Sequence, residues 1–185
     1  IKDNVATILI NRPEAMNAIN EEVIRQIDEQ FTKAIGNNEV KVIVLKGAGK
    51  AFIAGADIQY FIKKIEQNKI EDICKFTRYG HSVLNKIDNS DKPVIAELDG
   101  LALGGGAEIA LAADTIIATE KGSIGFPETG IGIYPGLGGT QRTTHYIGKE
   151  LAKYLIFTCK ILDAKTAKSI GLIEYVVPSE EIDDK

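Results

Sequence analysis

The sequence has few of the residues that build redox, metal or membrane sites. Its 185 residues include only two cysteines and two histidines. Cys74 and Cys159 form no CxxC pair, and neither His81 nor His145 has a partner at metal-ligand spacing. We therefore expect reduced thiols, a cytoplasmic setting and no metal. No apolar run reaches the ~18 residues that cross a bilayer, and the first residues show no signal-peptide pattern.

Positive charge and several nucleotide motifs are also missing. The net charge is −4 and the isoelectric point is about 5.3, which gives no reason to expect nucleic acid or an anionic membrane as partner. An anionic small molecule stays possible, because local backbone dipoles can outweigh the overall charge. There is no G-x-G-x-x-G and no G-x-S-x-G, and the glycine before Lys50 is not part of a phosphate loop.

The residues that are present indicate one α/β domain. The chain is 44% hydrophobic and 26% charged, which is ordinary for a globular protein. Runs of β-branched residues alternate with helical periodicity, which favours largely parallel sheets. Strands are expected at 5–10, 40–45, 94–98, 115–118 and 173–177. Helices are expected at 20–36, 59–87, from the end of the triple glycine to about 113, and at 140–147, 150–157 and 163–171, with 51–58 and 123–139 as loops and no fixed-period repeat.

The first candidate functional feature is the stretch Gly104-Gly105-Gly106-Ala107-Glu108. Glycine lets backbone N–H groups come close to a ligand, and a helix start leaves such groups unsatisfied. A developing negative charge would find a place there, with the Glu108 carboxylate one turn away. Taken alone, the stretch is equally well explained as a structural turn.

Two further loops carry comparable features. Glu128 is a lone carboxylate in a segment shaped by proline and glycine, and long irregular segments are often functional. The small residues of Ala54-Gly-Ala-Asp-Ile58 permit close backbone approach and offer a second N–H donor. Each could also be only a surface or connecting loop. Together, two carboxylates and two N–H groups suit proton chemistry beside a thioester carbonyl.

The chain resembles the enoyl-CoA hydratase/isomerase (crotonase) family over nearly its whole length. The matching stretches, in family order, are 11–18, 51–58, 92–96, 100–108, 126–128 and 135–142. The resemblance implies a spiral of repeated ββα turns and the binding of acyl-CoA thioesters. It also implies a homo-trimer or hexamer, and it extends to modules fused to a 3-hydroxyacyl-CoA dehydrogenase.

The resemblance also implies roles for particular residues. Ala56 and Gly105 match the two N–H donors of the family's oxyanion hole. The CoA and substrate channel is matched by Ala54, Asp57, Ile58 and Gln59. Hydratases of the family use two glutamates, and Glu108 and Glu128 occupy both positions. The implied activity is hydration of a trans-2-enoyl-CoA to a 3-hydroxyacyl-CoA in fatty-acid β-oxidation, with no cofactor besides the thioester substrate.

Two alternatives to the hydratase remain open at this point. A Δ3-Δ2 enoyl-CoA isomerase needs one base only, and a non-catalytic acyl-CoA-binding subunit needs neither. Family members usually continue for several tens of residues beyond the final predicted strand, into helices that cover the acyl pocket and help form the trimer. Because this chain stops at Lys185, we expect a single domain over 1–185 that lacks this C-terminal segment.

Overall fold

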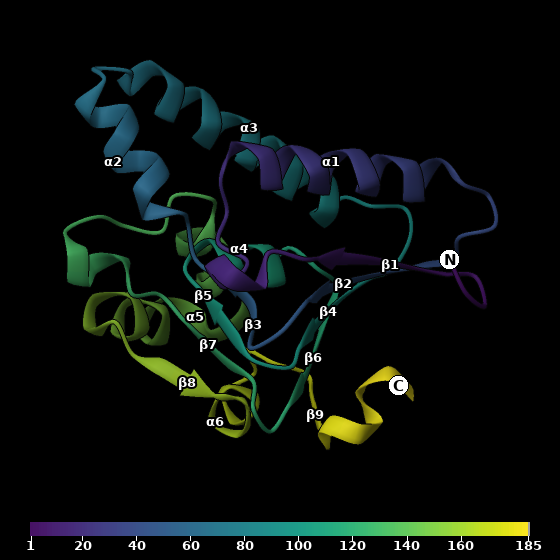
Figure 1. Cartoon of the computed structure of the whole chain (residues 1–185). Coiled ribbons are helices and arrows are strands. Elements are labelled where there is room, and N and C mark those ends of the chain that lie inside the picture. The colour runs from purple at the N-terminus through teal and green to yellow at the C-terminus, as the bar shows by residue number, and fades with distance from the viewer. Residues whose placement is uncertain (185) are drawn as a thin grey trace.

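The computed structural model describes residues 1–184, which form two β-sheets covered by helices (Figure 1). All neighbouring strands of the five-stranded sheet are parallel, in the order β1 (Val5–Ile10), β2 (Val42–Gly47), β4 (Val94–Leu98), β6 (Thr115–Thr119) and β9 (Tyr175–Val177). The four-stranded sheet has the order β3 (Ala51–Ala54), β5 (Leu101–Leu103), β7 (Ser123–Gly125) and β8 (Ile161–Asp163). Its first three strands are parallel, and β8 is antiparallel.

The chain visits the two sheets in turn, which confirms the expected ββα spiral. After β2, β4 and β6 of the five-stranded sheet, the chain continues into β3, β5 and β7 of the four-stranded sheet, respectively. A helical segment then follows each of these strands: α2 (Ile58–Glu66), α4 (Gly105–Ala110) and η2 (Glu128–Ile131). The three turns begin at Val42, Val94 and Thr115, so their lengths differ more than twofold. This uneven spacing explains why the sequence displays no fixed-period repeat.

Helix bounds follow the capping residues. The helices are α1 (Glu21–Gly36), α2 (Ile58–Glu66), α3 (Ile70–Asp88), α4 (Gly105–Ala110), α5 (Gly139–Thr158) and α6 (Ala164–Ser169), with short 3-10 turns η1 (Pro13–Ala15), η2 (Glu128–Ile131) and η3 (Ser179–Asp184). As predicted, Asn20 caps α1 by accepting the N–H of Val23, and Asp163 caps α6 by accepting that of Thr166. Gly148 interrupts α5 with a positive φ, which agrees with the two separate helices predicted at 140–147 and 150–157.

Several local predictions were wrong. The single helix expected at 59–87 is two helices, because Asn68 adopts a left-handed conformation between them. The helix expected up to 113 ends at Ala110. Four short strands, β3, β5, β7 and β8, were not predicted. They have only three or four residues each, so their extended form comes from pairing with neighbours rather than from propensity.

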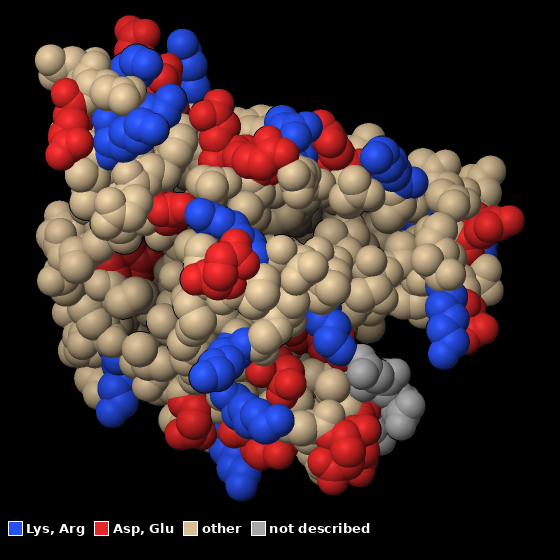
Figure 2. Space-filling model, viewed as in Figure 1, with Lys and Arg blue, Asp and Glu red and all other residues tan. Residues whose placement is uncertain are grey.

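The buried core lies between the sheets and their helices. Phe31, Phe52 and Phe126 are among its largest fully buried side chains. α1 and α3 lie together over one side of the five-stranded sheet, and α2 projects from them as an arm (Figure 1). Charges of both signs are interspersed on the face shown in Figure 2. Across residues 1–184, no helix has the length and apolarity that a membrane span requires.

Candidate active site

Three adjacent parallel strands bring the three predicted loops together. Ala54 of β3 pairs with Leu103 of β5, which pairs with Gly125 of β7. The residues that follow these three positions therefore leave the sheet at the same edge. They begin the Ala54–Ile58 loop, the triple-glycine stretch and the Glu128 loop, respectively. The register of one small sheet thus gathers segments that are far apart in the sequence.

The triple glycine is packed too closely for side chains. Gly104 has φ +51°, and a Cβ there would lie 2.6 Å from Oε1 of Glu128. A Cβ on Gly106 would lie 2.0 Å from the carbonyl oxygen of Ile53, because the start of α4 rests on β3. Glycine is therefore required at both positions. At Gly104 both the backbone conformation and the close contact demand it, and at Gly106 the close contact does.

Two backbone N–H groups are left as donors at this edge. Ile19 donates to Gly55 and accepts from Asp57, which makes a parallel bridge around Ala56. In that geometry the N–H of Ala56 points away from Ile19, toward the side on which β5 lies. Gly105 is the first residue of α4, so its N–H has no partner within the helix. Neither N–H is hydrogen-bonded to any residue in the described part of the chain.

Glu108 is a buried carboxylate held by one oxygen. Its Oε1 accepts the N–H groups of Leu137 and Gly139, each at 2.7 Å, and the residue is 1% exposed. Oε2 accepts no hydrogen bond from residues 1–184. Burial above all, together with the charge of Glu128, raises the pKa of Glu108 from 4.5 to about 7, against the lowering effect of the two N–H donors and of Arg142. The group is poised to exchange a proton near neutral pH.

Glu128 is the second buried carboxylate, in the 3-10 turn η2. It is 9% exposed, and its Oε2 is buried without a hydrogen-bond partner in the described structure. Burial raises the pKa of Glu128, against a hydrogen bond from its own backbone. Thr129 anchors the turn by donating its hydroxyl to the carbonyl of Ile156 at 2.7 Å. An unpartnered buried oxygen is an acceptor, or a donor when protonated, that is available to a ligand.

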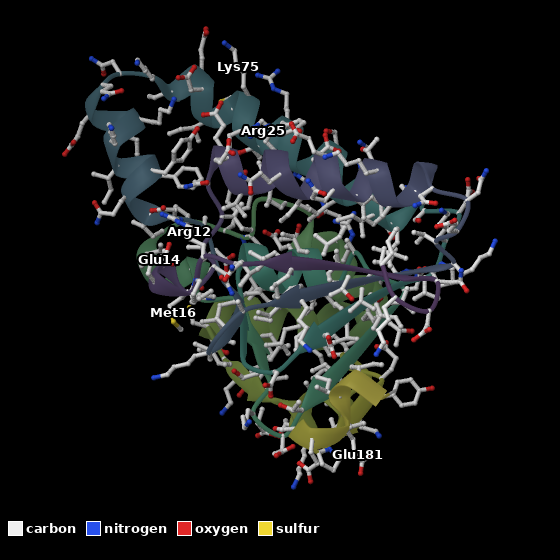
Figure 3. All side chains as sticks on the ribbon, turned by 45° about the vertical axis from the view of Figure 1, so that its right-hand side comes forward. Arg12, Glu14, Met16, Arg25, Lys75 and Glu181 are labelled. Atoms are coloured by element: carbon white, nitrogen blue, oxygen red, sulfur yellow. The ribbon has the colours of Figure 1, made fainter. Side chains whose placement is uncertain are left out.

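The other predicted channel residues lie at the end of β3 and the start of α2. Ala54 is partly buried and donates its N–H to Met16, whereas Ile58 and Gln59 are exposed. Asp57 has a structural task, since it caps α2 by accepting the N–H of Tyr60 and pairs with Arg12 at 2.9 Å. Arg12 lies close to the lower end of α2 in Figure 3.

Asn17 is a supporting residue that the sequence reasoning missed. It is fully buried and left-handed, with φ +59°. Its Nδ2 lies within 3.1 Å of the carbonyls of Ala48, Ala51 and Phe52, and its Oδ1 accepts the N–H of Arg12. Asn17 therefore fastens the segment before α1 to β3 and the loop behind the site. The tolerance of asparagine for left-handed backbone, and the place of Asn17 in the matching stretch 11–18, were the available signals.

Two cavities of the described structure lie away from the candidate site. Cavities of about 430 and 260 Å³ lie along β1 and α1, and neither Glu108 nor Glu128 lines them. Figure 2 shows a separate recess below the tip of the α2–α3 arm, with acidic atoms in its depth. The candidate site is thus defined by converging polar groups rather than by either of these cavities.

Comparison with known proteins decides the family. Residues 1–185 match the family model described as enoyl-CoA hydratase/isomerase. The chain belongs to the enoyl-CoA hydratase/isomerase family. It is 43% identical over 179 residues to the short-chain-enoyl-CoA hydratase of Clostridium acetobutylicum, covering 96% of this chain and 67% of that one. It is 38% identical over 182 residues to the crotonyl-CoA hydratase of Syntrophomonas wolfei, covering 98% and 68%.

Solved structures of the family share the fold. The enoyl-CoA hydratase of Bacillus anthracis superposes with a TM-score of 0.91 at 36% identity, covering 98% of this chain and 69% of that one. The enoyl-CoA hydratase of Thermoplasma volcanium gives 0.92 at 38% identity, covering 100% and 74%. These matches confirm the crotonase fold. The chain spans about two thirds of the length of the curated relatives described above.

Proposed function

We propose that this enoyl-CoA hydratase/isomerase family member is an enoyl-CoA hydratase. It adds water syn to a trans-2-enoyl-CoA and forms a 3-hydroxyacyl-CoA, in fatty-acid β-oxidation. The observation that carries the proposal is a pair of buried glutamates, Glu108 and Glu128, on segments that leave neighbouring strands at one sheet edge. The names of the two curated relatives, a short-chain-enoyl-CoA hydratase and a crotonyl-CoA hydratase, support the same reaction.

The N–H groups of Ala56 and Gly105 are proposed to bind the thioester oxygen. Both are unpaired in the described structure, and they lie after neighbouring strands. As water adds to C3, negative charge develops on that oxygen, and two fixed donors stabilise it without reorganisation. Loss of one such donor costs about 10²–10³ in rate in other enzymes. Ala54, Asp57, Ile58 and Gln59 are proposed to line the CoA and acyl path beside them.

The glutamates divide the proton transfers between them. Ionised Glu108 takes a proton from water through Oε2, because Oε1 is already occupied by two N–H groups. The hydroxide oxygen bonds to C3, and the C2–C3 π electrons pass into the enolate. Protonated Glu128 then gives its proton to C2. Glu108 ends protonated and Glu128 ends ionised. One proton therefore passes from Glu108 to Glu128 before the next turnover.

The test is a crotonyl-CoA hydration assay on matched Glu→Gln variants. Glu108→Gln and Glu128→Gln should each lose about 10²–10⁴ in kcat. Glu39→Gln, an exposed residue before β2, should keep the wild-type rate. Near wild-type turnover in either active-site variant contradicts the two-carboxylate mechanism. Loss of 3-enoyl-CoA isomerisation in only one variant favours the isomerase, and CoA-ester binding without turnover by the wild type favours the non-catalytic subunit.

We also propose a homo-trimer or hexamer in the cytoplasm, with an acyl-CoA as its ligand and no further cofactor. Exposed apolar side chains along the second half of α5 and on β8 support an assembly surface: Leu151, Tyr154, Phe157 and Ile161. A fused or associated 3-hydroxyacyl-CoA dehydrogenase would consume the product. Light scattering after size-exclusion chromatography measures the assembly, and a monomer across the micromolar range contradicts it.

A further inference from the structure

Arg142 is a largely buried cation that the proposed reaction does not use. Its side chain is 11% exposed, and it lies in the first turn of α5. Positive charge near a helix N-terminus is unfavourable, because the helix dipole is positive at that end. The stability of the helix therefore does not explain this residue, and its partners must be found elsewhere.

The guanidinium group of Arg142 joins three segments of the chain. Nη2 donates to Oδ1 of Asn85 and to Oδ2 of Asp88, both at 3.1 Å, and Nε donates to the same oxygen of Asp88 at 3.3 Å. Both partners lie in the last turn of α3. Nη1 donates to the carbonyl oxygen of Leu137 at 3.1 Å. The cation therefore fixes that carbonyl relative to the end of α3.

The carbonyl of Leu137 lies between the two donors that hold Glu108. The N–H of Leu137 and the N–H of Gly139 both bind Oε1 of Glu108, and the peptide group between them is the one that Arg142 holds. Gly138 connects them with φ +106°, and a Cβ there would lie 2.3 Å from Nη1 of Arg142. Three successive peptide groups are thus oriented by one carboxylate and one cation.

We propose that Arg142 is a positioning residue for Glu108, which it holds through the backbone of residues 137–139. This inference rests on the proposed hydratase function. Without the guanidinium group, the 137–139 backbone loses its tie to α3 and no longer aims two N–H groups at Oε1. Misplacement of a reacting group by about 1 Å can cost about 10²-fold in rate.

The charged groups that act on Glu108 come from η2 and α5, and α3 packs against α5 at this point. Glu128 on η2 opposes ionisation of Glu108, and Arg142 on α5 favours it. Asp88 of α3 pairs with Arg142, and the ring of His81, also on α3, is 3.9 Å from the Cβ position of Gly138. Removing the Arg142 charge should therefore raise the pKa of Glu108 and shift the acid limb of the kcat profile to higher pH.

The experiment compares Arg142→Met with Arg142→Lys and with Arg25→Met. Arg25 is a half-exposed residue whose ion pairs stay within α1. We expect Arg142→Met to lower kcat for crotonyl-CoA about 10- to 100-fold with little change in KM, and to move the acid limb upward. Arg142→Lys should lie between it and the wild type, because lysine restores the charge without the planar fork. Arg25→Met should match the wild type.

A second measurement does not depend on activity. The pH dependence of the free energy of unfolding is measured for the wild type, Glu108→Gln, Arg142→Met and the double variant. The difference that Glu108→Gln makes in each background gives the titration of Glu108. The titration of Glu108 should move to higher pH in the Arg142→Met background. An unchanged titration with unchanged kcat overturns the proposal. If the wild type is inactive, only the hydratase function fails, and the titration still decides the role of Arg142. If Arg142→Met does not fold, Asp88→Asn and Arg142→Lys replace it in the kcat comparison, and Arg142→Gln, which also lacks the positive charge, replaces it in the titration.

Discussion

The burial of Glu108 should make the stability of this protein fall as pH rises toward neutrality. The unfolded chain releases the Glu108 proton at a pKa of 4.5, whereas burial raises the folded-state pKa to about 7. Between these values the folded state keeps a proton that the unfolded state has lost. Stability therefore decreases with pH in this window, because the folded state binds more protons.

The size of the effect follows from the two pKa values. One pH unit of difference corresponds to about 1.4 kcal/mol, so ionising Glu108 in the folded state costs about 3 kcal/mol by pH 7–8. The residue is 1% exposed, so solvent screens this cost little. Against a typical stability of about 5–15 kcal/mol, the change is easily measured.

Glu108→Gln isolates the effect. The glutamine carbonyl oxygen accepts the same two N–H groups as Oε1 but does not ionise. In urea unfolding at pH 5, 6, 7 and 8, Glu108→Gln should gain stability over the wild type as pH rises, and the gain should level off above pH 7. Titrating groups that do not interact with Glu108 cancel in this difference. Glu39→Gln, where the residue is exposed, should show no such trend.

Two outcomes would contradict a raised pKa for Glu108. If the wild type gains stability relative to Glu108→Gln between pH 5 and pH 8, the folded state favours the ionised carboxylate, and burial does not raise its pKa. A flat difference means that the folded and unfolded pKa values are equal. Either outcome removes the basis for a group that exchanges protons near neutral pH.

Three further predictions concern the supports of the site. Asn17→Ala leaves buried carbonyls without a donor, so the urea midpoint should fall by the equivalent of about 1–3 kcal/mol. Gly106→Ala forces a Cβ to within 2.0 Å of the Ile53 carbonyl and should destabilise by at least about 1–3 kcal/mol. Gly36→Ala, which meets no atom within 4 Å, should be neutral or slightly stabilising in the same titration. Asp57→Ala should lower Tm more than Asp57→Asn, because asparagine keeps the cap of α2 and loses only the charge pair with Arg12.

Much of the fold was predictable because its signals are local. The long apolar strands and the capped helices were placed from periodicity and capping residues, as at Asn20 and Asp163. The short strands of the second sheet escaped prediction, since three or four residues cannot show a pattern and their pairing partners are distant in sequence. The break at Asn68 was missed for a related reason, because a single left-handed residue leaves the helical periodicity on both sides intact.

Which chemical groups are available can be read from the sequence alone: two isolated carboxylates, Glu108 and Glu128, and two small-residue loops, within a recognisable family pattern. The positions and protonation of these groups depend on the tertiary fold. The register of β3, β5 and β7 brings the loops to one edge. Burial then raises the pKa values of both carboxylates. The hydrogen bonds that link Arg142 to Glu108 through the backbone of residues 137–139 cannot be read from the sequence either. Hydrogen bonds and desolvation depend on neighbours that only folding brings together.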